Sequence, residues 1–271
     1  MQPLVSVIIP TYNGQRWLPE SAQSVLSQTY ANLELIIIDD GSQDGTRDIV
    51  ESLCRKDSRV RAIYKANGGV ATARNTGIAA TQGKYVSLLD QDDLFEPSKI
   101  EHQTAYLERH PETDLVYGQY LVTDDVGRIL KRQPAIPHIT FRELWESCSI
   151  HLGASLICKS TLEAVGRLNE KVGWADDIDL VLRIAKRGKI AFQEGVVFRH
   201  RRHGKNTSAA DERDFYRMTL RALSVIGPFP EEGVTVRKLH QKSGELIKGH
   251  TGNVSERSRF LHSCSNFFHR A

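Results

Sequence analysis

The first hundred residues alternate short apolar runs with longer amphipathic stretches. Four runs have the length and β-branched character of buried strands, at residues 5–9, 33–38, 60–64 and 85–89. Apolar residues recur at helical spacing in three intervening stretches, at residues 15–28, 46–55 and 71–80. Trp17 is predicted to lie on the core-facing side of the first. Since continuously apolar strands alternating with helices are typical of a parallel sheet covered on both faces, an α/β fold is predicted.

The pattern after residue 96 is less regular. Pro97 suits the first turn of a helix that reaches about Arg109. The other predicted elements are strands at 115–123 and 128–132 joined by a tight turn, a strand at 153–158, a helix at 160–165, a helix at 177–186 and a strand at 189–199. From about residue 209 onward the pattern is helical, basic and weakly apolar.

Each predicted strand of the first half ends in a polar cluster. The clusters are residues 10–13, 39–40, 66–69 and 90–93. Ligands of open parallel sheets bind beyond the carboxyl ends of the strands, so these clusters predict a binding site at one edge of the sheet. Ordinary polar loops are the alternative, and Asp39 in particular is open to a turn-forming role.

The densest cluster is Asp90-Gln91-Asp92-Asp93, directly after a buried strand. Three acids in four residues repel one another and lose hydration unless a cation is present. Carboxylates with an open coordination sphere suit Mg²⁺ or Mn²⁺. The alternative is that Asp92 or Asp93 caps the helix that begins near Pro97.

Composition narrows the class of protein. The net charge of +3, from 36 basic and 33 acidic residues, is too balanced to predict nucleic-acid binding. The four cysteines are scattered without zinc or redox spacing and are expected to be reduced, which favours the cytoplasm. No apolar run approaches the roughly 20 residues of a membrane span, and the early first strand leaves no room for a signal peptide.

Five segments in order carry a family resemblance. They are residues 5–14, 37–46, 67–77, 83–93 and 174–183. Together they resemble the family 2 glycosyltransferases, which are inverting enzymes of GT-A fold, over about residues 3–208. The resemblance implies a GT-A-type domain at residues 1–208, with a nucleotide-binding half to about 95 and an acceptor half from about 96. Residues 209–271 are then a helical C-terminal extension.

The resemblance implies a set of donor-binding residues. Pro10, Thr11 and Tyr12 would lie where the nucleotide base and ribose pack, and a tyrosine offers a flat stacking face. Asp40 would accept a hydrogen bond from the N3–H of uracil or thymine. Arg74 would reach the nucleotide, with support of its own loop as the alternative. Asp90 would contact the ribose or a metal-bound water.

The resemblance also implies a metal site and a segment that closes over the diphosphate. Asp92 would ligate the metal with Asp90, and His203 would be a further ligand compatible with Mn²⁺. Arg202 and Lys205 would neutralise the departing diphosphate. Simple exposure of His203 in a basic loop is the alternative.

Asp177 occupies the position of the family's catalytic base. The pair Asp176-Asp177 replaces the Glu-Asp that the family often has, and repulsion from Asp176 is expected to raise the pKa of Asp177. Capping of the helix is a structural alternative for Asp177. Trp174 is expected to pack against the sugar ring on the acceptor side, and a position in the hydrophobic core is the alternative.

These inferences predict a metal-dependent, inverting glycosyltransferase. A UDP-sugar donor is favoured, a dTDP-sugar donor stays open, and the acceptor would be a glycan or lipid-linked hydroxyl in bacterial surface polysaccharide synthesis. Such work would place the protein at the inner face of the cytoplasmic membrane. The basic tail is open to peripheral membrane contact, helix packing or homodimer contact. The rival readings are a nucleotidyltransferase and a non-catalytic nucleotide-sugar-binding protein. A dinucleotide-dependent oxidoreductase is disfavoured, because no G-x-G-x-x-G follows the first strand.

Overall fold

The computed structural model describes residues 2–133, 144, 150–204 and 206. The elements of the first half are β1 (Val5–Thr11), α1 (Leu18–Leu26), β2 (Leu33–Asp39), α2 (Thr46–Lys56), β3 (Val60–Tyr64), α3 (Val70–Ala80), β4 (Tyr85–Leu88) and β5 (Leu94–Phe95). The predicted extension at 209–271 lies outside the described residues.

The second half begins with the helix predicted after Pro97. Its elements are α4 (Lys99–Arg109), β6 (Leu115–Thr123), β7 (Ile129–Arg132), η1 (Leu152–Ala154), β8 (Ser155–Cys158), α6 (Lys159–Val165), η2 (Gly173–Ala175), α7 (Asp176–Arg187) and β9 (Ile190–Arg201). Each helix and strand predicted from periodicity within the described part therefore has a counterpart in the structure.

The strands form one nine-stranded mixed sheet. Its order is β3-β2-β1-β4-β8-β6-β9-β5, with β7 paired to β6. The predicted parallel arrangement is confirmed for β3, β2, β1 and β4. Beyond β4 the sheet is mixed, because β8 runs antiparallel to both of its neighbours and β6 is parallel to β9.

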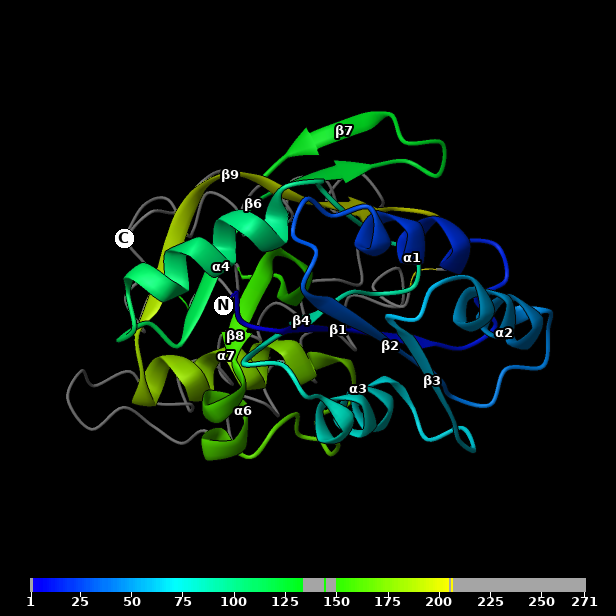
Figure 1. Ribbon diagram of the computed structural model, residues 1–271, viewed down its shortest axis with the longest axis horizontal. Coiled ribbons are helices and arrows are strands. Elements are labelled where there is room, and N and C mark those ends of the chain that lie inside the picture. The colour runs from blue at the N-terminus through cyan, green and yellow to red at the C-terminus, as the bar shows by residue number, and fades with distance from the viewer. Residues whose placement is uncertain (1, 134–143, 145–149, 205, 207–271) are drawn as a thin grey trace, which may run out of the picture.

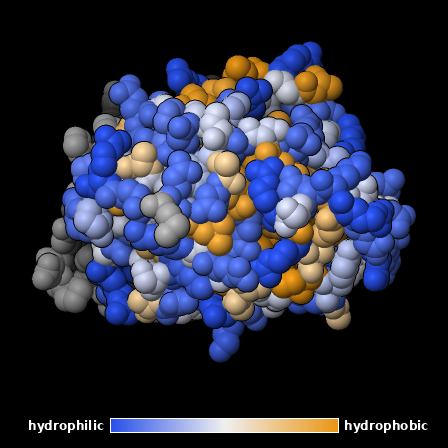
Figure 2. All heavy atoms as spheres, viewed as in Figure 1, coloured by the Kyte–Doolittle hydropathy of each residue, from blue (hydrophilic) through white to orange (hydrophobic). Residues whose placement is uncertain are grey.

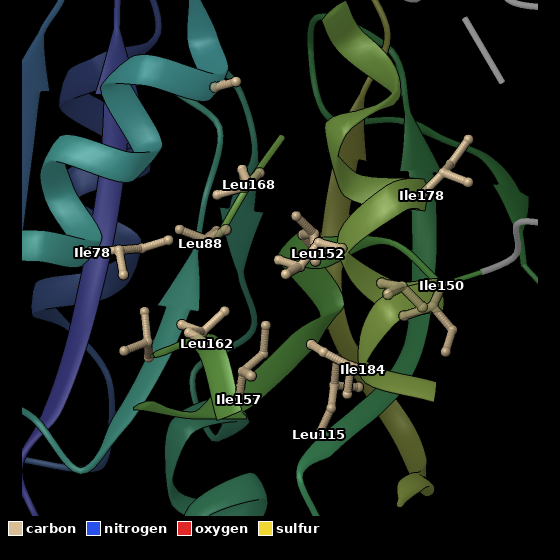
Figure 3. Packing of buried hydrophobic residues seen from close by; sticks show 14 of the residues in the cluster. Ile78, Leu88, Leu115, Ile150, Leu152, Ile157, Leu162, Leu168, Ile178 and Ile184 are labelled. Carbon is tan, nitrogen blue, oxygen red and sulfur yellow. The ribbon is translucent and has the colours of Figure 1, made fainter. Parts of the chain in front are cut away.

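Helices cover both faces of the sheet (Figure 1). Alternate residues of β1 point to opposite faces, as strand geometry requires. Ile8 belongs to the core beneath α3, α6 and α7, whereas Val7 and Ile9 belong to the core beneath α1, α2 and α4. Figure 3 shows the first of these cores, where Ile78 of α3 and Leu88 of β4 contribute side chains. The two apolar layers hold the carboxyl ends of the parallel strands in fixed relation.

Three differences from the sequence expectations bear on the site. Strand β1 continues through Pro10 to Thr11 instead of ending at residue 9. The pairing of β1 with β4 ends at Ile8, so Pro10, which has no N–H, does not interrupt a hydrogen-bonded ladder on the β4 side. Helix α1 starts at Leu18, which leaves Trp17 before the helix and outside its core face. The two-residue strand β5 follows the acidic cluster and pairs with β9, a long-range contact without a local pattern.

Candidate active site

The segment after β1 is joined to the acidic cluster after β4 by one glutamine. The Gln91 carboxamide oxygen accepts hydrogen bonds from Thr11 Oγ1 at 2.6 Å and from the Tyr12 N–H at 3.0 Å. Thr11 is buried, while the Tyr12 side chain is 43% exposed and free to stack on a flat ligand. Pro10 is buried and pairs with Ile38 of β2. The structure thus places the predicted donor loop at the rim, held by Gln91, a residue that the sequence analysis did not single out.

Asp40 is buried just beyond β2. Its carboxylate accepts hydrogen bonds from Lys65 Nζ at 2.5 Å and from the Gly69 N–H at 2.8 Å. The Gly68 N–H lies between the two oxygens, at 3.0 and 3.2 Å. Asp40 therefore ties the loop after β3 to the rim. Asp39 accepts from the Ser42 N–H at 2.9 Å, as expected of a turn-forming aspartate.

Arg74 of α3 joins two carboxylates that are far apart in the chain. Its Nη1 donates to both oxygens of Asp176, at 3.1 and 2.9 Å, and its Nη2 donates to Asp90 at 2.6 Å. Arg74 and Asp176 are buried, whereas the Asp90 side chain is 34% exposed. Burial alone would raise the pKa of Asp90, but Arg74 together with His151 and His200 outweighs it, and the pKa is lowered. Arg74 thus holds the acidic cluster against the start of α7.

Asp177 follows directly on α7. Burial, and then repulsion from Asp176, raises the pKa of its carboxyl to about 7. The predicted influence of Asp176 is therefore present but second to burial. Ala175 is the N-cap residue, and the Asp177 carboxylate accepts from the adjacent Ile178 N–H at 2.7 Å. A carboxyl group that titrates near neutral pH suits a general base.

Asp92 and His203 meet across more than a hundred residues of chain. Asp92 Oδ2 lies 2.9 Å from His203 Nε2 and accepts from Asn206 Nδ2 at 3.1 Å. Burial and the charge of Asp90 raise the pKa of Asp92. The His203 ring stacks on Trp17, with ring centroids 5.2 Å apart. Two residues predicted as metal ligands are thus brought together, and Trp17 packs on one of them.

Asp93, the last acid of the cluster, is buried inside the fold. It accepts from the Arg201 N–H at 2.8 Å, and His200 Nδ1 lies 3.3 Å from its Oδ2. Burial raises the pKa of Asp93 to about 7, although His200 opposes the shift. Potential ligand atoms of Asp93, His151 and His200 all lie within 4.8 Å of one another. Neither Asp92 nor Asp93 caps α4, whose N-cap residue is Ser98.

The structure describes fewer contacts for the remaining predicted site residues. Arg202 is exposed, and its backbone N–H donates to the Thr123 carbonyl at 2.8 Å. Trp174 contributes backbone to the turn η2, but its side chain lies outside the described part of the structure. Lys205 also lies outside the described residues. The proposed roles of these three residues stay predictions.

Comparison with known families decides the classification. The family model described as "Glycosyl transferase family 2" matches residues 6–164, more than half of this 271-residue chain. The chain belongs to glycosyltransferase family 2. The match begins in β1 and ends in α6, so it includes Thr11, Asp40, Arg74, Asp90 and Asp92 of the site.

Relatives of this family 2 chain carry related names. An uncharacterized glycosyltransferase of Rickettsia conorii is 36% identical over 213 residues, covering 76% of this chain and 35% of the relative. The chondroitin synthase of Pasteurella multocida is 30% identical over 206 residues, covering 76% of this chain and 21% of the synthase. The chain therefore spans about a third or less of the length of these two relatives.

Solved structures of similar fold include TarS of S. aureus. Residues 1–349 of TarS in complex with UDP-GlcNAc superpose on the family 2 chain with a TM-score of 0.67 at 17% identity, over 96% of this chain and 79% of TarS 1–349. The corresponding TarS structure with UDP has a TM-score of 0.63. At this identity the likeness shows the GT-A fold. Among the described residues, no helix combines the length and apolarity of a membrane span.

Proposed function

We propose that this family 2 chain carries an inverting, metal-dependent glycosyltransferase that uses a nucleotide-diphospho-sugar. The observation that carries the proposal is the double ion pair of Arg74, which joins Asp90 of the donor half to Asp176 beside the candidate base. Two halves of a reaction site, distant in sequence, are thereby fixed to each other. Transfer between a donor and an acceptor needs this kind of fixed juxtaposition.

The donor side of the proposal rests on the rim after β1 and β2. The exposed Tyr12 ring offers a stacking face for the base, next to the buried Pro10 and Thr11 at the end of β1. Asp40 accepts the N3–H of a pyrimidine base. The Gly68 N–H is shared between both Asp40 oxygens, so it keeps one partner when the other oxygen turns to the base.

Asp92, Asp90 and His203 are the proposed ligands of Mg²⁺ or Mn²⁺. Oxygen and imidazole donors are suitable for Mn²⁺, and burial together with the charge of Asp90 raises the pKa of Asp92. A divalent ion bound there would neutralise charge on the diphosphate as it leaves. Arg202, on the adjoining segment, adds positive charge on the same side.

Asp177 acts as the base in the proposed reaction. Its carboxylate removes the proton from the acceptor hydroxyl as that oxygen forms a bond to the anomeric carbon. The bond from that carbon to the diphosphate oxygen breaks with its electron pair going to the diphosphate, so configuration inverts. Asp176, held by Arg74, orients the start of α7 and keeps Asp177 in place. Trp174 is proposed as a wall for the acceptor.

A UDP-sugar is the favoured donor, and a dTDP-sugar has the same N3–H. The TarS structures hold UDP and UDP-GlcNAc, which supports the choice of uridine. The chondroitin synthase similarity supports polysaccharide synthesis as the setting. We propose a glycan or lipid-linked hydroxyl as acceptor, at the inner face of the cytoplasmic membrane.

The test is a binding and turnover series on the full chain. Thermal unfolding is followed with UDP, dTDP, GDP and ADP, each with Mn²⁺ or with a chelator. Ligand at about 100 times its Kd stabilises a protein by roughly 2.7 kcal/mol. We expect a metal-dependent shift with UDP, and slow UDP release from a UDP-sugar. No shift with any diphosphate would refute the proposed donor.

Two variants separate catalysis from binding. Asp177→Asn should abolish UDP release and leave the UDP-induced shift intact, whereas Asp48→Asn on exposed α2 serves as the matched control. Equal turnover of the Asp177→Asn variant and the control would remove Asp177 as the base. Release of pyrophosphate from UTP and a sugar phosphate would support a nucleotidyltransferase, and binding without consumption would support a non-catalytic protein.

A further inference from the structure

The most exposed large aliphatic residues of the described chain lie in one β-hairpin. Val126 is 70% exposed, Ile129 63% and Leu130 59%. The hairpin of β6 and β7 stands out from the body of the molecule (Figure 1), and Figure 2 shows apolar side chains along the same edge. We call residues 124–132 the hairpin tip. Aliphatic side chains in such a position point to a partner.

The aliphatic side chains of the hairpin tip are spread over the turn and the start of β7. Strand β7 pairs with β6, and all four of its residues are exposed. The register of this pairing shifts at Val122 and Thr123, so Leu130 lies unpaired between Ile129 and Lys131, while Val126 lies at the turn. A fluid apolar medium covers aliphatic side chains spread over a turn and a strand without the need for a matching protein surface.

Four backbone N–H groups of the turn are hydrogen-bonded within the hairpin tip. Asp124 Oδ1 accepts from the N–H groups of Val126 at 3.1 Å and Arg128 at 2.8 Å. The Gly127 N–H donates to the Asp124 carbonyl at 3.2 Å, and the Asp124 N–H donates to the Arg128 carbonyl at 2.9 Å. These groups need no water, so the cost of moving the turn towards an apolar medium is reduced.

The charges of the hairpin tip favour an anionic surface. Asp124 pairs with Arg128 at 2.6 Å and Asp125 pairs with Arg16 at 3.4 Å, so both acids are neutralised. Lys131 and Arg132 are exposed, and no ion pair joins either of them to another residue of the described chain. Aliphatic groups flanked by uncompensated cations match the interface of a bilayer with anionic lipids.

We propose that the hairpin tip docks into the headgroup region of an anionic lipid bilayer. Sugars are bound by aromatic faces and polar groups, and apart from the paired Asp125 the exposed tip side chains named above are aliphatic or cationic. A second copy is disfavoured, because charged residues such as Lys131 and Arg132 on an edge strand oppose pairing with another strand. Three aliphatic side chains also fall short of the roughly 800 Å² per partner of a stable interface.

The hairpin tip is joined to the candidate active site. Asp125 reaches Arg16, whose guanidinium lies over the ring of Trp17, and Thr123 at the end of β6 accepts from the Arg202 N–H. Docking would therefore bring the site to the membrane surface, where a lipid-linked hydroxyl lies. In this respect the inference rests on and deepens the proposed function.

Sedimentation of the full chain with vesicles tests the inference without any donor. Vesicles of phosphatidylcholine with phosphatidylglycerol are compared with vesicles of phosphatidylcholine alone. We expect binding to the anionic vesicles that weakens with added salt. Lys131→Gln/Arg132→Gln should weaken it about 25-fold, since each surface cation contributes about fivefold. Val126→Ser/Ile129→Ser/Leu130→Ser should weaken it about tenfold or more.

The matched control is Arg55→Gln/Lys56→Gln on exposed α2, which removes two cations elsewhere and should bind as the unchanged protein does. All variants should keep the unfolding temperature and the UDP release of the unchanged protein. Absent binding to anionic vesicles, or equal binding by the serine variant, overturns the inference. A dimer that only the serine variant loses, without vesicle binding, assigns the tip to a second copy and also overturns it. Failure of UDP release with intact vesicle binding counts against the proposed function alone.

Discussion

Replacement of Arg74 by methionine is expected to destabilise the fold by several kcal/mol. The guanidinium lies between Asp176, whose side chain is 1% exposed, and Asp90, whose side chain is 34% exposed. Methionine fills much of the same space but leaves both carboxylates without their cation. The loss of stability should therefore come from the uncompensated charge of the two carboxylates more than from a cavity.

The two carboxylates contribute unequally to that loss. Removing one partner of a buried ion pair costs about 3–5 kcal/mol, which applies to Asp176. Asp90 borders on solvent, so its pair with Arg74 adds at most about 1 kcal/mol. For a domain of this size 3–5 kcal/mol corresponds to a fall of roughly 6–20 °C in Tm.

The pH dependence identifies the cause. Burial raises the pKa of Asp176 even with Arg74 present, and loss of Arg74 raises it further. The folded state then holds a proton that the unfolded state releases, so stability falls as pH rises between the unfolded and the folded pKa. The loss of unfolding free energy in the Arg74→Met variant should accordingly become smaller as the pH is lowered from 8 to 5.

Urea unfolding of Arg74→Met, Asp176→Asn and the double variant measures the coupling between the two residues. The double variant should recover part of the stability that Arg74→Met loses, because no buried charge is left unpaired. A deficit below about 1 kcal/mol that does not change with pH, together with additive effects, would refute the role assigned to this ion pair.

Three further predictions concern activity. Because the pKa of Asp177 is about 7 and the base must be ionised, kcat/KM should fall about tenfold per pH unit below that value; a flat profile from pH 5 to 8 would contradict it. His203→Asn should raise the Mn²⁺ concentration for half-maximal activity at least about tenfold, as measured by metal titration, and an unchanged requirement would exclude His203 as a ligand. Gln91→Ala removes the acceptor for Thr11 and Tyr12, so donor KM should rise about fivefold to tenfold with little change in kcat; an unchanged KM would contradict its positioning role.

Several features of the site were predictable because their signal is local. The apolar run of β1 and the helical periodicity of α7 follow from period and length, as does the placement of Asp40 and Asp90 at carboxyl ends of parallel strands. The nearness of Asp92 to His203 was also expected, although from family resemblance and not from spacing.

Long-range contacts had no such signal. In the sequence Gln91 cannot be distinguished from other polar loop residues, because its role depends on its contacts with Thr11 and Tyr12. Trp17 fitted the predicted helix face, but in the structure it packs on His203. The exposure of the hairpin tip could not be predicted either, because an aliphatic strand has the same sequence pattern whether or not other elements cover it.

The sequence by itself determined the α/β class, the order of the elements and the carboxylates at the rim, since hydrophobic period and strand polarity act over a few residues. Only the tertiary structure decided which charges share a partner. Arg74 meets Asp90 and Asp176 because α3 packs under the sheet beside the start of α7, and burial there, more than the neighbouring charge, raises the pKa of Asp177. Burial and electrostatic coupling depend on distances between distant segments, and those distances exist only after folding.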